Sequence, residues 1–141
     1  MKNNPPILII SMAVYYGGGE SYLLNLEKLL SKKYEITIIT SSKILQNKSI
    51  SKTIFVRKIR LLYFIAIFSN ILKFIVTKKP KFVILNGPLE SSFSKFFKIV
   101  GVETIAVKHT DFYEDNLYQN QFPQQAVSLR NSLRVTKNIL Y

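Results

Sequence analysis

The fold is decided near the start of the chain by the apolar run Ile7-Leu8-Ile9-Ile10-Ser11, the glycine turn Gly17-Gly18-Gly19, and a leucine-rich run from Ser21 to Lys33. Four consecutive apolar residues, mostly β-branched, predict a strand that is buried on both faces, as strands of parallel sheets are. The leucine-rich run places its apolar residues at helical spacing, which predicts a helix with one buried face. The chain thus opens with a strand, a turn and a helix, the unit from which parallel α/β sheets are built.

The glycine turn is a candidate ligand site because it lies at the N-terminus of the predicted helix. Backbone N–H groups there lack partners within the helix, and the helix dipole favours negative charge. Gly17, Gly18 and Gly19 would let a phosphate or a sugar hydroxyl approach the backbone closely. Glu20 would accept a hydrogen bond from a ligand hydroxyl. The alternative is that the three glycines form only a flexible connection between strand and helix.

Two familiar phosphate-binding motifs do not fit this turn. A P-loop has a Lys-Ser/Thr pair after its last glycine, whereas Glu20 and Ser21 follow here. A dinucleotide fingerprint needs a third glycine where this chain has Tyr22, and an acidic residue after the second strand, where it has Thr40-Ser41-Ser42. NAD is therefore not expected, and no other cofactor is predicted.

Composition indicates a single globular domain. Hydrophobic residues make up 48% of the 141 residues, which is enough for a sizeable core and excludes a disordered chain. The absence of cysteine excludes a disulfide framework and any thiolate chemistry. The N-terminus, with one lysine in Met1–Pro6 and an apolar run broken by Gly17, is not predicted to be a signal peptide. Together with the lack of cysteine, this predicts a cytoplasmic protein.

The charge is strongly one-sided, with 20 Lys and Arg against 8 Asp and Glu and a net charge of +12. No acidic residue occurs between Glu35 and Glu90, while ten basic residues do. Such a field predicts an anionic partner, either phospholipid, nucleic acid or a phosphorylated substrate. The alternative is a solvated lysine-rich surface. Nucleic acid is not expected, because no recognition motif accompanies the charge.

Strands and helices are predicted to alternate along the chain. After the first strand and helix, the strands are expected at 34–40, 53–57, 81–85 and 103–108, the helices at 59–77, 90–100 and from Ala126 onward, a loop at 41–51, and the start of a further strand at 139–141. This order predicts an α/β fold with a doubly wound, mostly parallel, Rossmann-like sheet in a three-layer α/β/α arrangement.

The apolar segment at 59–77 is too interrupted to cross a membrane, and it contains a lysine. It is predicted to be either a core helix or an interfacial helix lying on a membrane surface. Basic residues flank or interrupt it, and for the interfacial case they would contact anionic lipid. These predicted membrane-contact residues are Arg57, Lys58, Arg60, Lys73, Lys78 and Lys79.

Small and polar residues follow four of the predicted strands. They are the glycine turn, Ser41-Ser42, Asn86-Gly87 and His109-Thr110-Asp111. Ligands bind at the carboxyl ends of strands in doubly wound sheets, so these residues predict a binding crevice. His109 is the sole histidine, and the alternative is a purely structural role for it. No catalytic residue is assigned and no metal site is predicted, because one histidine near a few acids is a weak ligand set.

The order of these stretches resembles family 4 glycosyltransferases of the GT-B fold. The similarity is carried by the turn Gly18-Gly19-Glu20, the strand at 34–40, the segment Lys79–Asn86 and the segment Val107–Asp111, and it extends from Ile7 to Tyr113. The resemblance implies transfer of a sugar from a nucleotide-sugar donor to a glycan or lipid-linked acceptor, in cell-surface polysaccharide synthesis and without a metal.

The resemblance also implies roles for individual residues. Gly18 and Gly19 would lie near the donor phosphates and the acceptor, and His109 would contact the transferred sugar. The family's donor site belongs to a second Rossmann-like domain, so residues 1–141 are expected to be the N-terminal, acceptor-side domain, truncated or one subunit of a split enzyme, and inactive alone. The alternative is a non-catalytic module that binds a membrane surface or a protein partner. A peripheral location on the inner face of the plasma membrane would suit either.

Overall fold

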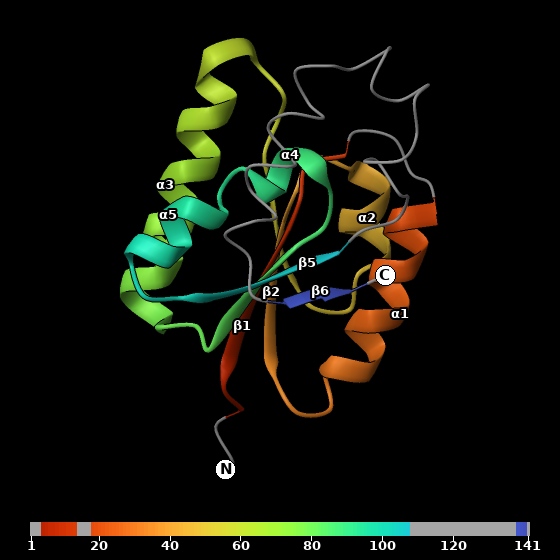
Figure 1. The fold of residues 1–141 in the computed structure, drawn as a ribbon. Helices are drawn as coiled ribbons and strands as arrows, with labels where there is room; N and C mark the ends of the chain where they lie inside the picture. Colours follow the sequence, from red (N-terminus) through yellow and green to blue (C-terminus); the bar gives the residue numbers. More distant parts are fainter. Residues whose placement is uncertain (1–3, 14–17, 108–137, 141) are drawn as a thin grey trace, which may run out of the picture.

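The computed structural model describes residues 4–13, 18–107 and 138–140, which form a single six-stranded sheet covered by helices on both faces (Figure 1). Every pair of neighbouring strands is parallel, and the order across the sheet is β3-β2-β1-β4-β5-β6. The strands are β1 (Pro6–Ser11), β2 (Glu35–Thr40), β3 (Lys52–Phe55), β4 (Phe82–Leu85), β5 (Glu103–Val107) and β6 (Asn138–Leu140).

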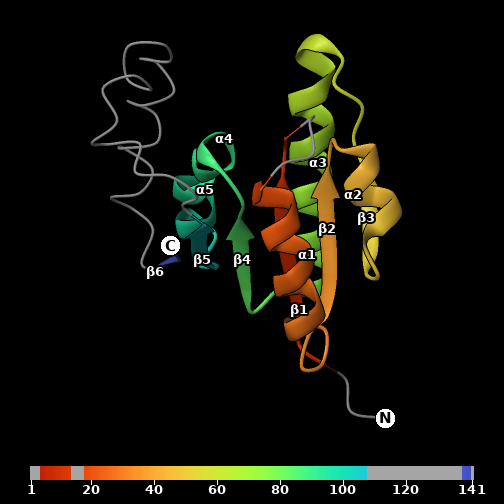
Figure 2. The same cartoon turned by 90° about the vertical axis from the view of Figure 1, so that its right-hand side faces the viewer.

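Two helices cover each face of the sheet, and a fifth, short helix lies at its carboxyl edge. Figure 2 shows α1 in front of the strands and α3 behind them. The first layer consists of α1 (Gly18–Leu30) and α2 (Lys43–Lys48), and the second of α3 (Arg60–Lys78) and α5 (Ser94–Ile99); the short helix at the carboxyl edge is α4 (Pro88–Ser91). The predicted three-layer, doubly wound α/β fold is therefore confirmed.

The central strand β1 is buried on both faces, as its apolar run predicted. Ile7 and Ile9 pack with Leu23 of α1, whereas Leu8 and Ile10 pack with the α3 side of the core. All four of these strand residues have 0% of their surface exposed. An uninterrupted apolar run is stable only where helices cover both faces, so these residues place β1 at the centre of the sheet.

The direction in which successive strands are added to the sheet reverses at β1. From β1 it adds β2 and β3 on one side, then crosses to the opposite side of β1 with β4 and continues outward. The carboxyl ends of β1 and β4 therefore lie side by side while their following loops diverge. In open α/β sheets this is the position at which ligands bind.

Two predicted segments differ from the structure. The loop expected at 41–51 contains α2, which begins because Ser42 Oγ accepts a hydrogen bond from Leu45 N–H at 3.2 Å. Only Leu45 of this short helix is buried, so no apolar periodicity marks it.

The single helix expected at 90–100 is divided into α4 and α5. Ser91 and Ser92 donate their hydroxyls to the backbone carbonyls of Gly87 and Leu89, at 2.8 and 2.6 Å. Such hydroxyl bonds compete with regular helical hydrogen bonding and favour a break.

Other predictions agree with the structure where it describes them. The helix expected at 59–77 is α3, which ends as Lys79 adopts a left-handed conformation (φ 50°) before Pro80. The strand expected at 139–141 is β6. The helix expected from Ala126 lies outside the described residues. Across the part of the chain that is described, no helix has the length and apolar content needed to cross a bilayer.

Glu27 of α1 stabilises the connection between α2 and β3. Its carboxylate is buried, and Oε1 accepts hydrogen bonds from Ser49 Oγ at 2.6 Å and from Ser51 N–H at 2.7 Å. Because hydrogen bonds to a buried charged group are strong, we expect Glu27→Leu to lower the free energy of unfolding by about 2 kcal/mol in urea titrations.

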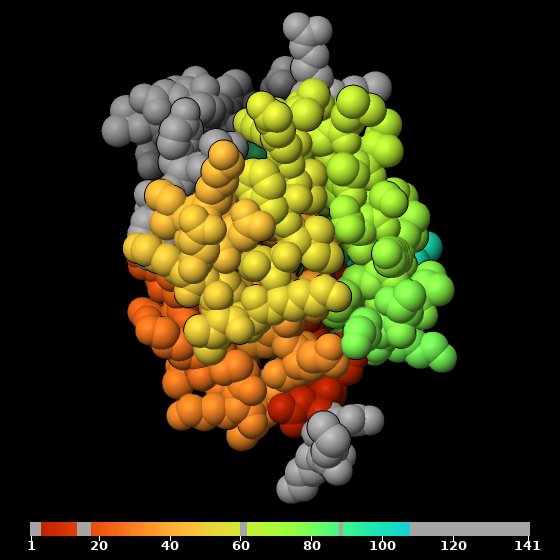
Figure 3. Space-filling model, turned by 180° about the vertical axis from the view of Figure 1, so that it is seen from behind, coloured from red at the N-terminus to blue at the C-terminus, as the bar shows by residue number. Residues whose placement is uncertain are grey.

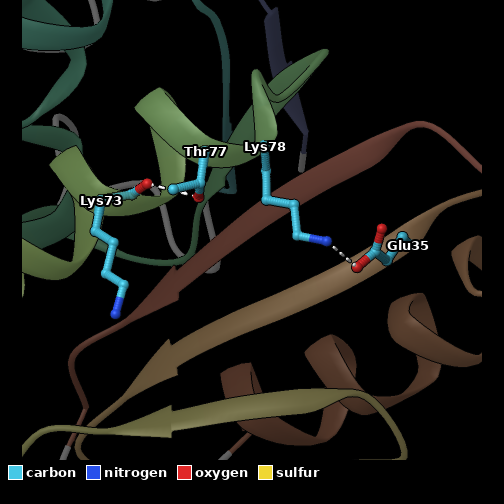
Figure 4. A network of polar contacts seen from close by, with 4 residues as sticks. All are labelled: Glu35, Lys73, Thr77 and Lys78. Atoms are coloured by element: carbon cyan, nitrogen blue, oxygen red, sulfur yellow. Dashed lines mark hydrogen bonds and ion pairs between the residues drawn. The ribbon is translucent and has the colours of Figure 1, made fainter.

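The matched control for this prediction is Glu35→Gln. Glu35 pairs with Lys78 at 3.0 Å, but both side chains are about half exposed (Figure 4). An exposed pair of this kind contributes little, so the control is expected to change stability by less than about 1 kcal/mol. Equal stability of Glu27→Leu and the unmodified protein would show that the Glu27 bonds do not hold the connection.

Candidate ligand site at the carboxyl edge of the sheet

The carboxyl ends of β1 and β4 are joined by polar contacts. Asn86 follows β4 directly, and its Nδ2 donates to Ser11 Oγ at the end of β1 at 3.1 Å. Its backbone N–H also donates to Ile10 O at 2.9 Å. Ser11 and Asn86 are both buried. These bonds fix the two strand ends from which the loops around the predicted crevice depart.

Glu90 of α4 reaches across this edge to the chain that leaves β1. Its Oε1 accepts a hydrogen bond from the backbone N–H of Met12, and its side chain is only 3% exposed. Gly87, with φ at +144°, lies directly beside the carboxylate, because a Cβ placed there would come within 2.7 Å of Glu90 Oε2. Glycine is therefore favoured at this position because a side chain would occupy the space that Glu90 fills.

Two carboxyl groups meet at the edge. Burial raises the pKa of Glu90 to about 7; the hydrogen bond from Met12 N–H opposes this shift, and the negative charge of Glu20 adds to it. Glu20 is itself buried in the first turn of α1. At neutral pH, therefore, a substantial fraction of the Glu90 carboxyl groups carries a proton.

Tyr63 of α3 contacts the other side of the same peptide segment. Its hydroxyl lies 2.6 Å from Ser41 Oγ and donates a weaker bond to Met12 O at 3.4 Å. Burial raises the pKa of Tyr63, the hydrogen bond with Ser41 lowers it, and the charge of Glu90 raises it further. Met12 is thus held at its N–H by α4 and at its carbonyl by α3, which sets the direction in which the chain leaves β1.

The structure brings several predicted site residues to this edge. Gly18, Gly19 and Glu20 form the first turn of α1, and Asn86 and Gly87 connect β4 to α4. The predicted residues Gly17, His109, Thr110 and Asp111 lie outside the described residues.

Sequence reasoning assigned no site role to Glu90 or Tyr63. For Glu90 a signal was present, since it is the first acidic residue after a gap of more than fifty positions and directly follows a strand-end turn. For Tyr63 there was none, because it occurs within a continuous apolar run.

The described residues make this edge a preorganised scaffold. In this part of the chain no buried side-chain nitrogen or oxygen lacks a hydrogen-bond partner. Among the same residues, no three His, Cys, Asp or Glu side chains gather closely enough to hold a metal ion. The polar groups described here therefore act mainly on the protein itself, by holding Met12 where the chain leaves β1.

The predicted membrane-contact residues lie along α3 and at its two ends. Arg57 and Lys58 are exposed before the helix, Lys73 and Lys78 are exposed on it, and Lys79 ends it. Arg60 begins α3.

No family model and no curated protein matches the sequence. Solved structures do match the fold. HepE of Anabaena in complex with UDP-glucose superposes with a TM-score of 0.66 and 13% identity, over 95% of this chain and 36% of that one. Phytolacca americana UGT2, complexed with UDP-2fluoro-glucose and pterostilbene, has a TM-score of 0.70 and 9% identity over 99% and 48% of the two chains. The lipopolysaccharide outer core galactosyltransferase WaaB, in its apo form, has a TM-score of 0.64 and 14% identity over 96% and 38%.

At these identities the likeness establishes the fold alone. TubZ of the Clostridium botulinum phage c-st shares it more distantly, with a TM-score of 0.55 and 18% identity. The chain spans between 36% and 48% of the length of HepE, UGT2 and WaaB. Its fold is the Rossmann-like α/β fold of the N-terminal half of GT-B glycosyltransferases.

Proposed function

We propose that this chain is the acceptor-side half of a glycosyltransferase of family 4, which transfers a sugar from a nucleotide-sugar donor to a glycan or lipid-linked acceptor. The observation that carries the proposal is the match of almost the whole chain to between 36% and 48% of the length of structures that include a galactosyltransferase and two proteins bound to UDP or a UDP-sugar. The sequence resemblance, which follows the same order of strands and loops, supports it independently. Cell-surface polysaccharide synthesis is the process that we infer.

In this proposal the glycine turn is the ligand-binding element. Gly18 and Gly19 open α1 at the carboxyl edge, where the first-turn N–H groups and the helix dipole suit a phosphate or a hydroxyl. Asn86 and Gly87 lie beside β1 at the same edge, and His109, Thr110 and Asp111 are proposed to complete the crevice. A second domain or a separate subunit would bind most of the donor, and no metal is required.

We expect the double variant Gly18→Val/Gly19→Val to abolish sugar transfer by the enzyme that contains both halves. Bulky side chains would prevent a ligand from approaching the backbone of the turn. At Gly18 an added Cβ meets no atom within 4 Å, so the backbone there has room for a side chain, and we expect the double variant to keep its fold. Transfer is measured with a radiolabelled nucleotide sugar, and folding by circular dichroism.

Asn25→Val is the matched control, since Asn25 is exposed on the same helix but more than a turn further from the edge. It should retain transfer. Retained transfer in the glycine variant would contradict the proposed site. A monomeric chain of 141 residues that transfers sugar unaided would contradict the assignment as one half of an enzyme.

The second candidate is a non-catalytic module on the same fold that binds a membrane surface or a protein partner. It is favoured by the exposed apolar side chains of α3, several of which are more than half exposed. Calorimetry with UDP-glucose separates the two candidates when it is run on the assembled protein. Donor binding there supports the transferase, and its absence together with binding to lipid or protein supports the module.

A further inference from the structure

The outward side of α3 is apolar, unlike that of an ordinary surface helix. The helix buries Tyr63, Ile67, Ile71 and Phe74 against the sheet. The opposite side of a surface helix is normally polar. Here it carries five exposed apolar residues, which we call the α3 outer face: Leu62, Ile65, Phe68, Leu72 and Val76, between 39% and 73% exposed.

A shallow groove continues this apolar surface toward α5. Its volume is about 480 Å³, and it is lined by Phe64, Ile65, Phe68, Ser69, Leu72 and Phe93. In the view from behind, the residues of α3, coloured from yellow-green to green, form the outer flank of the molecule (Figure 3). The apolar surface is therefore on the outside of the fold.

The charges around this surface are almost all positive. Residues 57–100 contain nine basic residues and a single acidic one, Glu90, which is buried at the carboxyl edge. Lys78 is paired with Glu35 (Figure 4). Other basic residues before, on and after α3, and on α5, are exposed: Arg57, Lys58, Lys73, Lys79, Lys81, Lys95 and Lys98.

We propose that the α3 outer face binds the surface of an anionic lipid bilayer. Apolar side chains bordered by lysines suit the boundary between headgroups and acyl chains, where the lysine stems lie along the apolar surface and the ammonium groups reach lipid phosphates. A second copy of the chain is a poorer occupant, because each copy carries a net charge of +12 and like charges would face each other. The proposal does not depend on sugar transfer.

Docking in this way would also place the candidate ligand site near the membrane. The helix runs alongside the strands, and its first turns extend beyond their carboxyl ends (Figures 1 and 2). Leu62 and Ile65 belong to this first half of the helix. A lipid-linked acceptor at the membrane surface would therefore lie within reach of the carboxyl edge.

The test is co-sedimentation with vesicles of phosphatidylglycerol and phosphatidylcholine, compared with vesicles of phosphatidylcholine alone. The unmodified chain should bind the anionic vesicles, and binding should weaken as salt rises. The double variant Ile65→Glu/Val76→Glu should lose binding by about tenfold or more, because it removes two apolar contacts and adds repulsive charges. Both residues are more than half exposed, so the fold should tolerate the change.

The matched control is Leu29→Glu/Ile50→Glu, which alters the net charge equally at two exposed apolar residues of the other helical layer and its connections. It should bind within about threefold of the unmodified chain. Equal losses in both variants would reduce the effect to non-specific attraction and overturn the proposal, as would equal binding to neutral vesicles at every salt concentration. Sedimentation velocity in the absence of lipid provides the second readout. A dimer that only the α3 variant dissociates would assign the face to a second copy and overturn the membrane proposal.

Discussion

Gly87→Ala will lower the free energy of unfolding by about 3 kcal/mol, because alanine would strain the backbone at this position and its Cβ would clash with Glu90. The φ of Gly87 is +144°, a region that residues with a side chain rarely adopt, and the Cβ would come within 2.7 Å of Glu90 Oε2. A flexible carboxylate could normally move aside. Glu90 is buried and holds the Met12 N–H, so its displacement would break that bond. Urea unfolding followed by circular dichroism measures the loss.

Two glycine controls separate the causes of this loss. Gly101 also has a positive φ, of +73°, but an added Cβ there meets nothing within 4 Å, so Gly101→Ala should cost only about 1 kcal/mol of backbone strain. Gly18 has the same free space without a positive φ, so Gly18→Ala should be nearly neutral. If Gly87→Ala proves no more destabilising than Gly101→Ala, the contact with Glu90 is not what requires glycine.

The contribution of Glu90 to the free energy of unfolding will fall as pH rises from about 4.5 to about 7. The folded protein binds this proton more tightly than the unfolded chain, because burial disfavours the charged carboxylate. Protonation therefore favours the folded state throughout this interval, and the advantage is lost once pH exceeds the folded-state pKa. A shift of this size corresponds to about 3 kcal/mol.

Glu90→Gln isolates this effect from other titrating groups. The amide keeps an oxygen that can accept from Met12 N–H but has no proton to lose, so the difference between the two pH profiles belongs to Glu90. The free energy of unfolding of the unmodified protein minus that of Glu90→Gln should therefore decrease steadily as pH rises across the interval. Glu35→Gln, which replaces an exposed carboxyl group, should show no such trend. A difference that stays constant with pH would mean that Glu90 keeps an ordinary pKa in the folded protein.

These two predictions concern contacts that no local pattern encodes. Met12 and Glu90 are 78 positions apart, and they meet only because β4 is placed beside β1. Tyr63 reaches Met12 across 51 positions because α3 packs against the face of the sheet that includes β1. The sequence showed small and polar residues after four of the predicted strands and therefore predicted an edge suited to ligands. It could not show which of those groups would be occupied by contacts within the protein.

By itself, the sequence determined the elements whose burial has a single solution. The run Ile7–Ile10 has no polar side to expose, so it had to be a central strand between two helical layers, and Pro80 had to follow the end of α3.

The tertiary structure alone decided three further features. It revealed α2, which a capping serine and one buried leucine support without any periodicity. It placed Glu90 against Gly87 and Met12. It also decided the position of the apolar helix at 59–77, whose composition alone is equally compatible with the core and with the surface. The physical reason is that composition sets how much apolar surface a helix has, whereas the packing of its neighbours sets how much of that surface is covered. The sheet covers one side of α3, and the side bearing Leu62, Ile65 and Val76 remains exposed.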